Sequence, residues 1–281
     1  MSTKTKATPK TKTLRKEDLP EILSPTVDII FKILFGDERN RDILADFLSA
    51  VLGFKVSQTS ITLLDPHLQR DSPEDKLGVL DMKLKLRGGK YVNVEMQVGK
   101  LKNIRHRVEY YINNMLVRQL GKSNRYEKLR PVVAIVIVAE GNMLPETKRF
   151  HSEFGTLEKT ELYELHGLRT IHTLELPKLP EGANGKLEDW LKFIKSEKKE
   201  EYMAVAQKSK PMKRALEVLE EVSADQRLRD QYFYRKIAKM DEIARLDYAR
   251  DEGMEMGMAK VFALIEQGLT PEEAKKKLGL K

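Results

Sequence analysis

Residues 80–98, with the sequence LDMKLKLRGGKYVNVEMQV, decide the fold of this chain. Before the pair Gly88-Gly89, leucine and methionine alternate with charged residues, and after it valine and methionine alternate with polar residues. Side chains along a β-strand point alternately to opposite faces, so each half of this stretch has one apolar face and one polar face. The pattern predicts two β-strands joined at the glycine pair as a hairpin.

The length of the turn determines which residues of the two strands share a face, because directly opposed residues lie on the same face of a sheet. A two-residue turn at Gly88-Gly89 would place the two apolar rows on opposite faces, where a single core cannot bury both. We therefore expect a turn with an odd number of residues, or a bulge, with glycine in the left-handed conformation. In that register, Leu84 lies opposite Val92 or Val94.

The same register brings polar side chains together, because it places Asp81 opposite Glu95 or Gln97. Two carboxylates about 4–5 Å apart repel by roughly 3–4 kcal/mol at an effective dielectric constant of about 20. A divalent cation would replace this repulsion by coordination to hard oxygen ligands. The alternative is a solvated sheet face on which Lys83 and Lys85 balance the acids, and the spacing alone leaves both alternatives open.

Apolar periodicity predicts the remaining elements. Helices are expected near residues 25–36, 38–52, 103–120 and 187–194, and further strands near 54–64, 132–139, 150–154 and 168–176. The run 132–139 is apolar throughout, which is typical of a strand that is buried on both faces and lies near the centre of a sheet. Beyond residue 195 the sequence favours charged helices, with capping boxes expected at Ser223 with Gln226 and at Thr270 with Glu273.

The composition excludes several classes of protein. The 281 residues are 41% hydrophobic and 33% charged, which indicates a packed core beneath a charged surface. The absence of cysteine excludes disulfides, thiolate zinc sites and cysteine nucleophiles. The longest apolar run, residues 132–139, is far shorter than the roughly 20 residues of a membrane-spanning helix. Because an apolar signal segment is also absent, we expect a cytoplasmic protein.

The net charge of +8 is concentrated at the N-terminus. Residues 1–16 contain six lysines and arginines and no acid, so the rest of the chain has a net charge of only +2. We expect residues 1–20 to form a disordered basic tail, because they include almost nothing to bury. Such a tail would bind a phosphate backbone loosely, or would only increase solubility.

The hairpin and its surroundings resemble the PD-(D/E)xK nucleases, and more specifically the PD-(D/E)xK nuclease-family transposases, also called recombination-promoting nucleases. The matching hairpin motifs are GVLDMKLKL at residues 78–86 and VNVEMQV at residues 92–98, and PTVDIIFKILFG at residues 25–36 resembles the opening helix of the family. Further matching positions are Arg107, Tyr111, Gln119, Leu120, Tyr126, Leu129, Pro131, the LELPKL motif of residues 174–179 and Trp190. The resemblance covers roughly residues 24–195.

The resemblance implies a fold of the α/β class: a restriction-endonuclease-like mixed sheet flanked by helices, with a C-terminal helical extension. It also implies a divalent-metal-dependent DNA endonuclease that hydrolyses phosphodiester bonds and is associated with recombination or mobile elements. In this interpretation residues 21–195 form the nuclease-like domain, and residues 196–281 form a helical extension for oligomerisation or docking. We expect DNA as the partner, self-association through the C-terminal helices, and no membrane.

The resemblance places the site on the hairpin. Asp81, Glu95 and the backbone carbonyl of Met96 would bind Mg²⁺ or Mn²⁺, which prefer oxygen ligands. Gln97 occupies the position that a catalytic lysine holds in the wider superfamily. Glutamine orients a water molecule by hydrogen bonds but adds no charge. The alternative function is therefore a catalytically weak or inactive module that keeps the nuclease fold and binds DNA or oligomerises.

Other candidate residues lie outside the hairpin. Asp28 and Lys32 are four residues apart on the first expected helix, where Asp28 would be an accessory catalytic acid and Lys32 a phosphate contact. Alternatively, the two form an ordinary ion pair. Lys76, Arg107 and Gln119 are expected to contact DNA, with surface or structural roles as the alternatives.

Overall fold

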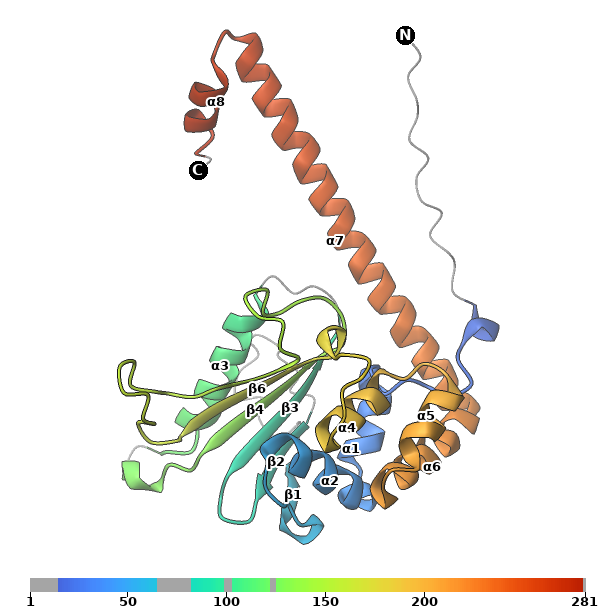
Figure 1. Cartoon of the computed structure of the whole chain (residues 1–281). Helices are drawn as coiled ribbons and strands as arrows, with labels where there is room; N and C mark the ends of the chain where they lie inside the picture. The colour runs from blue at the N-terminus through green and yellow to red at the C-terminus, as the bar shows by residue number, and fades with distance from the viewer. Residues whose placement is uncertain (1–14, 65–81, 99–102, 122–124, 280–281) are drawn as a thin grey trace. The chain divides into compact units, whose positions relative to one another are not determined.

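The computed structural model describes residues 15–64, 82–98, 103–121 and 125–279. Within them, six strands form one mixed sheet in the order β1-β2-β3-β4-β6-β5 (Figure 1). The strands are β1 (Ile61–Leu64), β2 (Met82–Leu86), β3 (Tyr91–Gln97), β4 (Val132–Val138), β5 (His151–Phe154) and β6 (Arg169–Glu175). Strands β3, β4 and β6 are parallel to one another, and the other three pair antiparallel with their neighbours.

Helices cover both faces of this sheet, which confirms the expected α/β fold with C-terminal helices (Figure 1). Helix α3 (Ile104–Val117) packs on one face. On the other side of the sheet, one apolar core is shared with α1 (Asp28–Gly36), α2 (Arg41–Leu52), α4 (Lys186–Lys195), α5 (Lys199–Ala206) and α6 (Lys210–Ala224). They are followed by α7 (Gln226–Glu266) and α8 (Pro271–Lys277). Short 3-10 helices are η1 (Lys16–Asp18), η2 (Glu38–Asn40), η3 (Gln58–Ser60), η5 (Tyr126–Lys128) and η6 (Leu176–Lys178).

The turn between β2 and β3 has three residues, as the apolar alternation requires. Leu84 lies opposite Val92, and the N–H of Leu86 donates to the carbonyl of Lys90 over 2.8 Å. Residues 87–89 remain as the turn, and its two glycines have φ angles of 96° and 93°. Glycine adopts this region without steric cost. The expected odd register is therefore confirmed, and both apolar rows face the same core.

Strand β4 is buried along its whole length and pairs with β3 and β6, so the expected central strand is confirmed. Its side chains alternate between two apolar cores, one beneath α3 and a larger one beneath the five helices of the other face. Trp190 is fully buried in the larger core, with its ring centroid 5.8 Å from that of Phe35 and 6.0 Å from that of Phe47. Its indole N–H donates to Asp46 over 3.0 Å, which satisfies the one polar atom of the side chain. Among the described helices, none is both long and apolar enough to cross a lipid bilayer.

The strand expected over residues 54–64 is shorter than predicted, because only β1 joins the sheet. The N–H of Val56 donates to the hydroxyl of Ser49 over 2.9 Å. Ser49 lies on α2, so this hydrogen bond ties the preceding segment to a helix instead of to a neighbouring strand.

Only one of the two expected capping boxes forms. Thr270 and Glu273 cap α8 reciprocally, as predicted. Ser223 instead lies within α6, where its hydroxyl accepts a hydrogen bond from the N–H of Leu23 over 2.9 Å. The side chain of Asp225 accepts the first N–H groups of α7 in its place. The prediction for Ser223 was wrong because the serine serves a contact that is distant in sequence.

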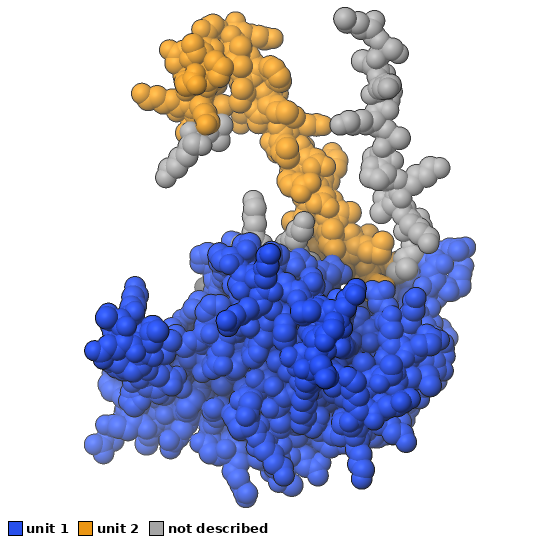
Figure 2. Space-filling view, in the orientation of Figure 1, with its two compact units in different colours: residues 1–233 blue, residues 234–281 orange. Residues whose placement is uncertain are grey.

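The chain divides into two compact units, residues 1–233 and residues 234–281 (Figure 2). Sequence reasoning placed the division at residue 195, before α5. Helix α6 contacts α1 and α2, and α5 contacts α4 and α6, so both belong to the first unit. Of the expected basic tail, residues 1–14 lie outside the described residues, whereas Lys16 forms an ion pair of 2.7 Å with Asp230.

A histidine pair joins the edge strand β5 to β6. Nε2 of His151 lies 3.1 Å from Nδ1 of His172, and the two rings stack with centroids 5.3 Å apart. Burial lowers the pKa of His172 to about 4, and the positive charges of His151 and Lys90 act in the same direction. Burial also lowers the pKa of His151, although Glu153 and Glu188 oppose that shift. The folded protein therefore favours neutral imidazoles at this position.

We expect the free energy of unfolding to fall as the pH decreases from about 6.5 toward 4, because the unfolded state then binds a proton that folded His172 excludes. The contribution of neutral His172 to the free energy of unfolding is fully present above the pKa of the unfolded state. It is lost as the pH falls to the folded pKa, and the complete loss is about 3 kcal/mol. Urea unfolding across this range measures the slope. His172→Phe should flatten it and the exposed control His166→Asn should not; an unchanged slope in His172→Phe would contradict the assignment.

Candidate functional site

The parallel strands β3, β4 and β6 end at the same edge of the sheet, and their last residues form the candidate site. On the face covered by α3, two rows of side chains cross this edge. The first row consists of Glu95, Val136 and Thr173, and the second of Gln97, Val138 and Glu175. Two carboxylates and one amide therefore lie on this face at the edge of the sheet, beside the apolar side chains of Val136 and Val138.

Glu95 is the central charged group of this site and is 3% exposed. A guanidinium nitrogen of Arg107, on α3, donates to its Oε1 over 3.1 Å. The amide of Gln97 donates to the same oxygen. A buried carboxylate is stable only when an opposite charge and hydrogen bonds replace its hydration. Arg107 and Gln97 supply both, so Glu95 is held as an oriented anion.

Arg107 and Gln97 are in turn positioned by their own elements. The guanidinium of Arg107 lies 5.8 Å from the ring centre of Tyr111, one turn further along α3. Gln97 is the last residue of β3, and its backbone carbonyl accepts the N–H of Ala139 over 2.8 Å. The three matching positions Gln97, Arg107 and Tyr111 thus form one connected group around Glu95.

Two of the sequence-predicted site residues, Asp81 and Lys76, lie outside the described residues. Met96 follows Glu95 on β3, and its side chain packs into the core on the opposite face. In the described parts of the chain, no cluster of three histidine, aspartate or glutamate side chains is arranged to hold a metal ion. Of the predicted ligands, Glu95 contributes a buried carboxylate, which is the oxygen type that Mg²⁺ prefers.

The two residues predicted on α1 are described by the position of their helix. Asp28 and Lys32 lie on this helix, which packs on the face opposite Glu95. Among the described contacts, no ion pair joins Asp28 to Lys32. The hydrogen bonds described for Glu95 come from β3 and α3, and none comes from α1.

Gln119 has a defined structural contact. Its amide donates to the carbonyl of Arg130 over 3.0 Å and accepts the N–H of Arg130 over 2.8 Å. This pair of bonds joins the end of α3 to the segment that enters β4.

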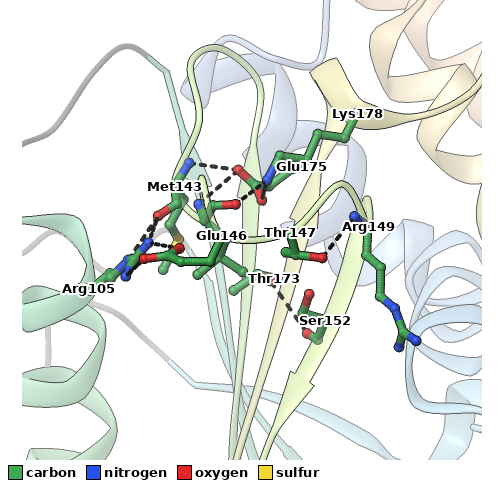
Figure 3. Close-up of polar contacts among 10 residues, drawn as sticks. Arg105, Met143, Glu146, Thr147, Arg149, Ser152, Thr173, Glu175 and Lys178 are labelled. Carbon is green, nitrogen blue, oxygen red and sulfur yellow. Dashed lines mark hydrogen bonds and ion pairs between the residues drawn. The ribbon is translucent and has the colours of Figure 1, made fainter.

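Sequence reasoning assigned no role to the buried ion pair at the end of β6. Glu175 is 1% exposed and accepts the N–H of Met143 over 2.7 Å and that of Leu144 over 3.3 Å (Figure 3). Lys178 donates to the other carboxylate oxygen over 2.5 Å and to the carbonyl of Leu144 over 2.6 Å. The LELPKL motif contains both residues, but only the loop after β4 completes their hydrogen bonds.

The same loop is bonded to α3 from its other side. Arg105 donates to the carbonyl of Met143 over 2.7 Å and to the carboxylate of Glu146 over 2.6 Å (Figure 3). Charged hydrogen bonds of this kind are roughly twice as strong as neutral ones. Residues 143–146 are therefore held between α3 and the end of β6, beside the carboxyl edge of the sheet.

One comparison with known proteins identifies a relationship. The model of a family described as "PD-(D/E)XK nuclease family transposase" matches residues 25–249. This range includes the whole sheet and helices α1 to α6. No curated protein gives a significant match, and no solved structure does.

We expect Glu175→Gln to lower the free energy of unfolding by about 2–4 kcal/mol, because it leaves the buried ammonium of Lys178 without its counter-ion. The matched control is Glu146→Gln, which removes a carboxylate on the same loop that is 66% exposed and should change stability little. Urea unfolding monitored by circular dichroism compares the two variants. Equal effects would contradict the structural role assigned to Glu175.

Proposed function

Because the chain belongs to the PD-(D/E)XK nuclease-family transposases, we propose that it is a divalent-metal-dependent DNA endonuclease associated with recombination or mobile elements. The observation that carries this proposal is the buried carboxylate of Glu95, held by Arg107 and Gln97 at the carboxyl edge of the parallel strands. A metal ligand must be ionised and fixed in orientation, and the contacts of Glu95 with Arg107 and Gln97 support both conditions.

We propose Asp81, Glu95 and the backbone carbonyl of Met96 as ligands of Mg²⁺ or Mn²⁺. Met82 lies opposite Val94. The odd register predicted from the sequence places Asp81 opposite Glu95 or Gln97, so that two carboxylates would share one face. When bound, the ion would polarise the scissile phosphate, activate a water molecule and offset the charge of the transition state.

The other residues of the group have roles that follow from their contacts. Arg107 is 36% exposed, so its guanidinium is available to a phosphate oxygen while it still orients Glu95. Gln97 holds Glu95 and, through its amide, would orient the attacking water. Outside this group, on α1, we propose Asp28 as an accessory acid and Lys32 as a phosphate contact.

Two further positions complete the proposed DNA contacts. Lys76 is proposed to contact the phosphate backbone directly. Gln119 would act through its hydrogen bonds to the backbone of Arg130, which fix the segment that presents the arginine.

A catalytically weak or inactive DNA-binding module is the second candidate, and the contact of Gln97 favours it. The amide of Gln97 already donates to Glu95. A lysine at this position would add a positive charge beside the attacking water, which glutamine does not supply. In this alternative the chain binds DNA without metal-dependent turnover.

We expect Asp81→Ala and Glu95→Gln each to abolish cleavage of supercoiled DNA in Mg²⁺ or Mn²⁺, with a loss of at least about 100-fold. The control Glu109→Gln changes an exposed carboxylate on α3 that pairs with Arg169, and should cleave as wild type. Gel electrophoresis of nicked and linear products measures the rates. Cleavage that persists in Asp81→Ala would refute the metal site, and DNA binding by wild type without cleavage would favour the second candidate.

We also propose that α7 mediates self-association. Met254, Met258, Val261 and Ile265 follow the a and d positions of two heptads on this helix. Three of them are exposed, with fractions of 59% for Met254, 53% for Met258 and 41% for Ile265. A second copy of the same helix offers the matching apolar row. Pairing of two such rows would bury side chains that water otherwise surrounds.

We expect Met258→Glu with Ile265→Glu to convert an oligomer into a monomer of 32.4 kDa. The charge would have to be buried between the helices, which is costly. The control Met256→Glu lies outside the heptad row although Met256 is also exposed, and should leave the mass unchanged. Light scattering after size exclusion measures both. A monomeric wild type at all concentrations would overturn this assignment.

A further inference from the structure

An open cleft lies at the opposite end of the β2–β3 hairpin from Glu95. It has a volume of about 570 Å³ and is lined by the turn, by the start of β1 and by Arg130. Among the described residues that line it, Lys85, Arg87 and Arg130 are charged and none is acidic. Thr59 and Thr62 add hydroxyl groups beside them. The cleft therefore offers cationic and hydroxyl donors, the groups that bind phosphate oxygens.

The three cations of this cleft have no acidic partner in the described part of the chain. Lys85, Arg87 and Arg130 are exposed and take part in none of the ion pairs that the structure describes there. Many other charged groups of the domain are paired, such as Arg105 with Glu146 and Arg169 with Glu109. A concentration of uncompensated positive charge attracts anions.

Hydrogen bonds fix the backbone at Arg87 and Arg130, two of the three cations of the cleft. The N–H of Arg87 donates to the carbonyl of Ser60 over 2.8 Å, which holds the turn against β1. A Cβ atom at Gly89 would lie 3.1 Å from the side chain of Arg130, so the glycine makes room for that arginine. Gln119 fixes the backbone of Arg130 on both sides.

The cleft also lies in line with the candidate active site. Lys83 and Lys85 lie opposite Asn93 and Tyr91, on the same face of the sheet as Glu95. Glu95 lies four positions beyond Tyr91 on β3, a distance of about 13 Å along the strand. This equals about four base-pair steps of a duplex at 3.4 Å each. A phosphate backbone bound at the turn would therefore lead along β2 toward Glu95.

We infer that the cleft formed by Lys85, Arg87 and Arg130 is a second binding site for the phosphodiester backbone of DNA, distinct from the cleavage site. The substrate class rests on the proposed endonuclease function, but the binding itself needs neither metal nor catalysis. The site holds the backbone several nucleotides away from the bond at Glu95. It sets the position of the strand without recognising bases.

The test is binding of a labelled duplex by the full chain in EDTA, measured by fluorescence anisotropy at several salt concentrations. The turn variant combines Lys85→Gln, Arg87→Gln and Arg130→Gln. We expect its affinity to fall by at least about tenfold and the slope of log affinity against log salt to decrease by about 2–3, because three phosphate contacts are lost.

The matched control removes the same charge from α6 and from the start of α7. It combines Lys210→Gln, Lys213→Gln and Arg227→Gln, exposed residues without described side-chain ion pairs. We expect its affinity to stay within about twofold of wild type, because these residues lie outside the cleft. Thermal unfolding of both variants verifies that the substitutions leave the fold intact.

The outcomes separate this inference from the endonuclease proposal. A turn variant that binds as the control does would overturn the second site, even if wild type cleaves DNA in Mn²⁺. Selective loss of binding in the turn variant supports the site, even if wild type never cleaves. Absence of DNA binding by wild type at low salt would overturn the inference as well.

Discussion

The structure depends on one constraint: the apolar rows of β2 and β3 must face the same core. A sheet strand has a period of two residues, so a turn of the wrong parity would expose one of the two rows. The three-residue turn at residues 87–89 meets the constraint, with glycine at both left-handed positions. The polar rows then also share a face, which is where Glu95 and Lys83 lie. Core packing and the placement of the charged residues thus have a single geometric cause.

Burial of charge at the carboxyl edge adds a second level of organisation. Glu95 and Glu175 are both nearly inaccessible, and each has a cation within hydrogen-bond distance. Their contacts differ in kind. Glu175 accepts two backbone N–H groups of a loop, whereas the hydrogen bonds described for Glu95 come from the side chains of Gln97 and Arg107. Side-chain partners move with less cost than backbone, so Glu95 is the group that a ligand can more easily recruit.

Most of the fold followed from sequence because its signals are local. Each signal depends only on residues that are close together in the sequence. Examples are the alternation in β2 and β3, the apolar run of β4 and the Thr270 capping box. Two predictions were wrong because a tertiary contact decides the local structure. Ser223 binds Leu23, which is remote in the sequence. The segment before β1 binds Ser49, which lies on α2. Local propensity is overridden where such tertiary hydrogen bonds form.

The candidate site was predictable only in part for the same reason. The spacing of Glu95 and Gln97 marks two residues of one strand face, and the structure joins them to Arg107. The burial of Glu175 depends on a loop more than 30 residues away in the chain, so no local pattern indicates it. The positions of Glu95 and Glu175 were therefore easier to predict than the residues that bind them.

The loop after β4 has a consequence for ligand affinity. Its backbone is anchored at Met143 by Arg105 on one side and by Glu175 on the other. Segments that become ordered only on binding subtract their lost conformational entropy from the affinity. Because folding has already immobilised residues 143–146, that entropic penalty does not recur when a ligand arrives. This edge of the sheet is therefore preorganised, and residues 143–146 need not become ordered when a ligand binds.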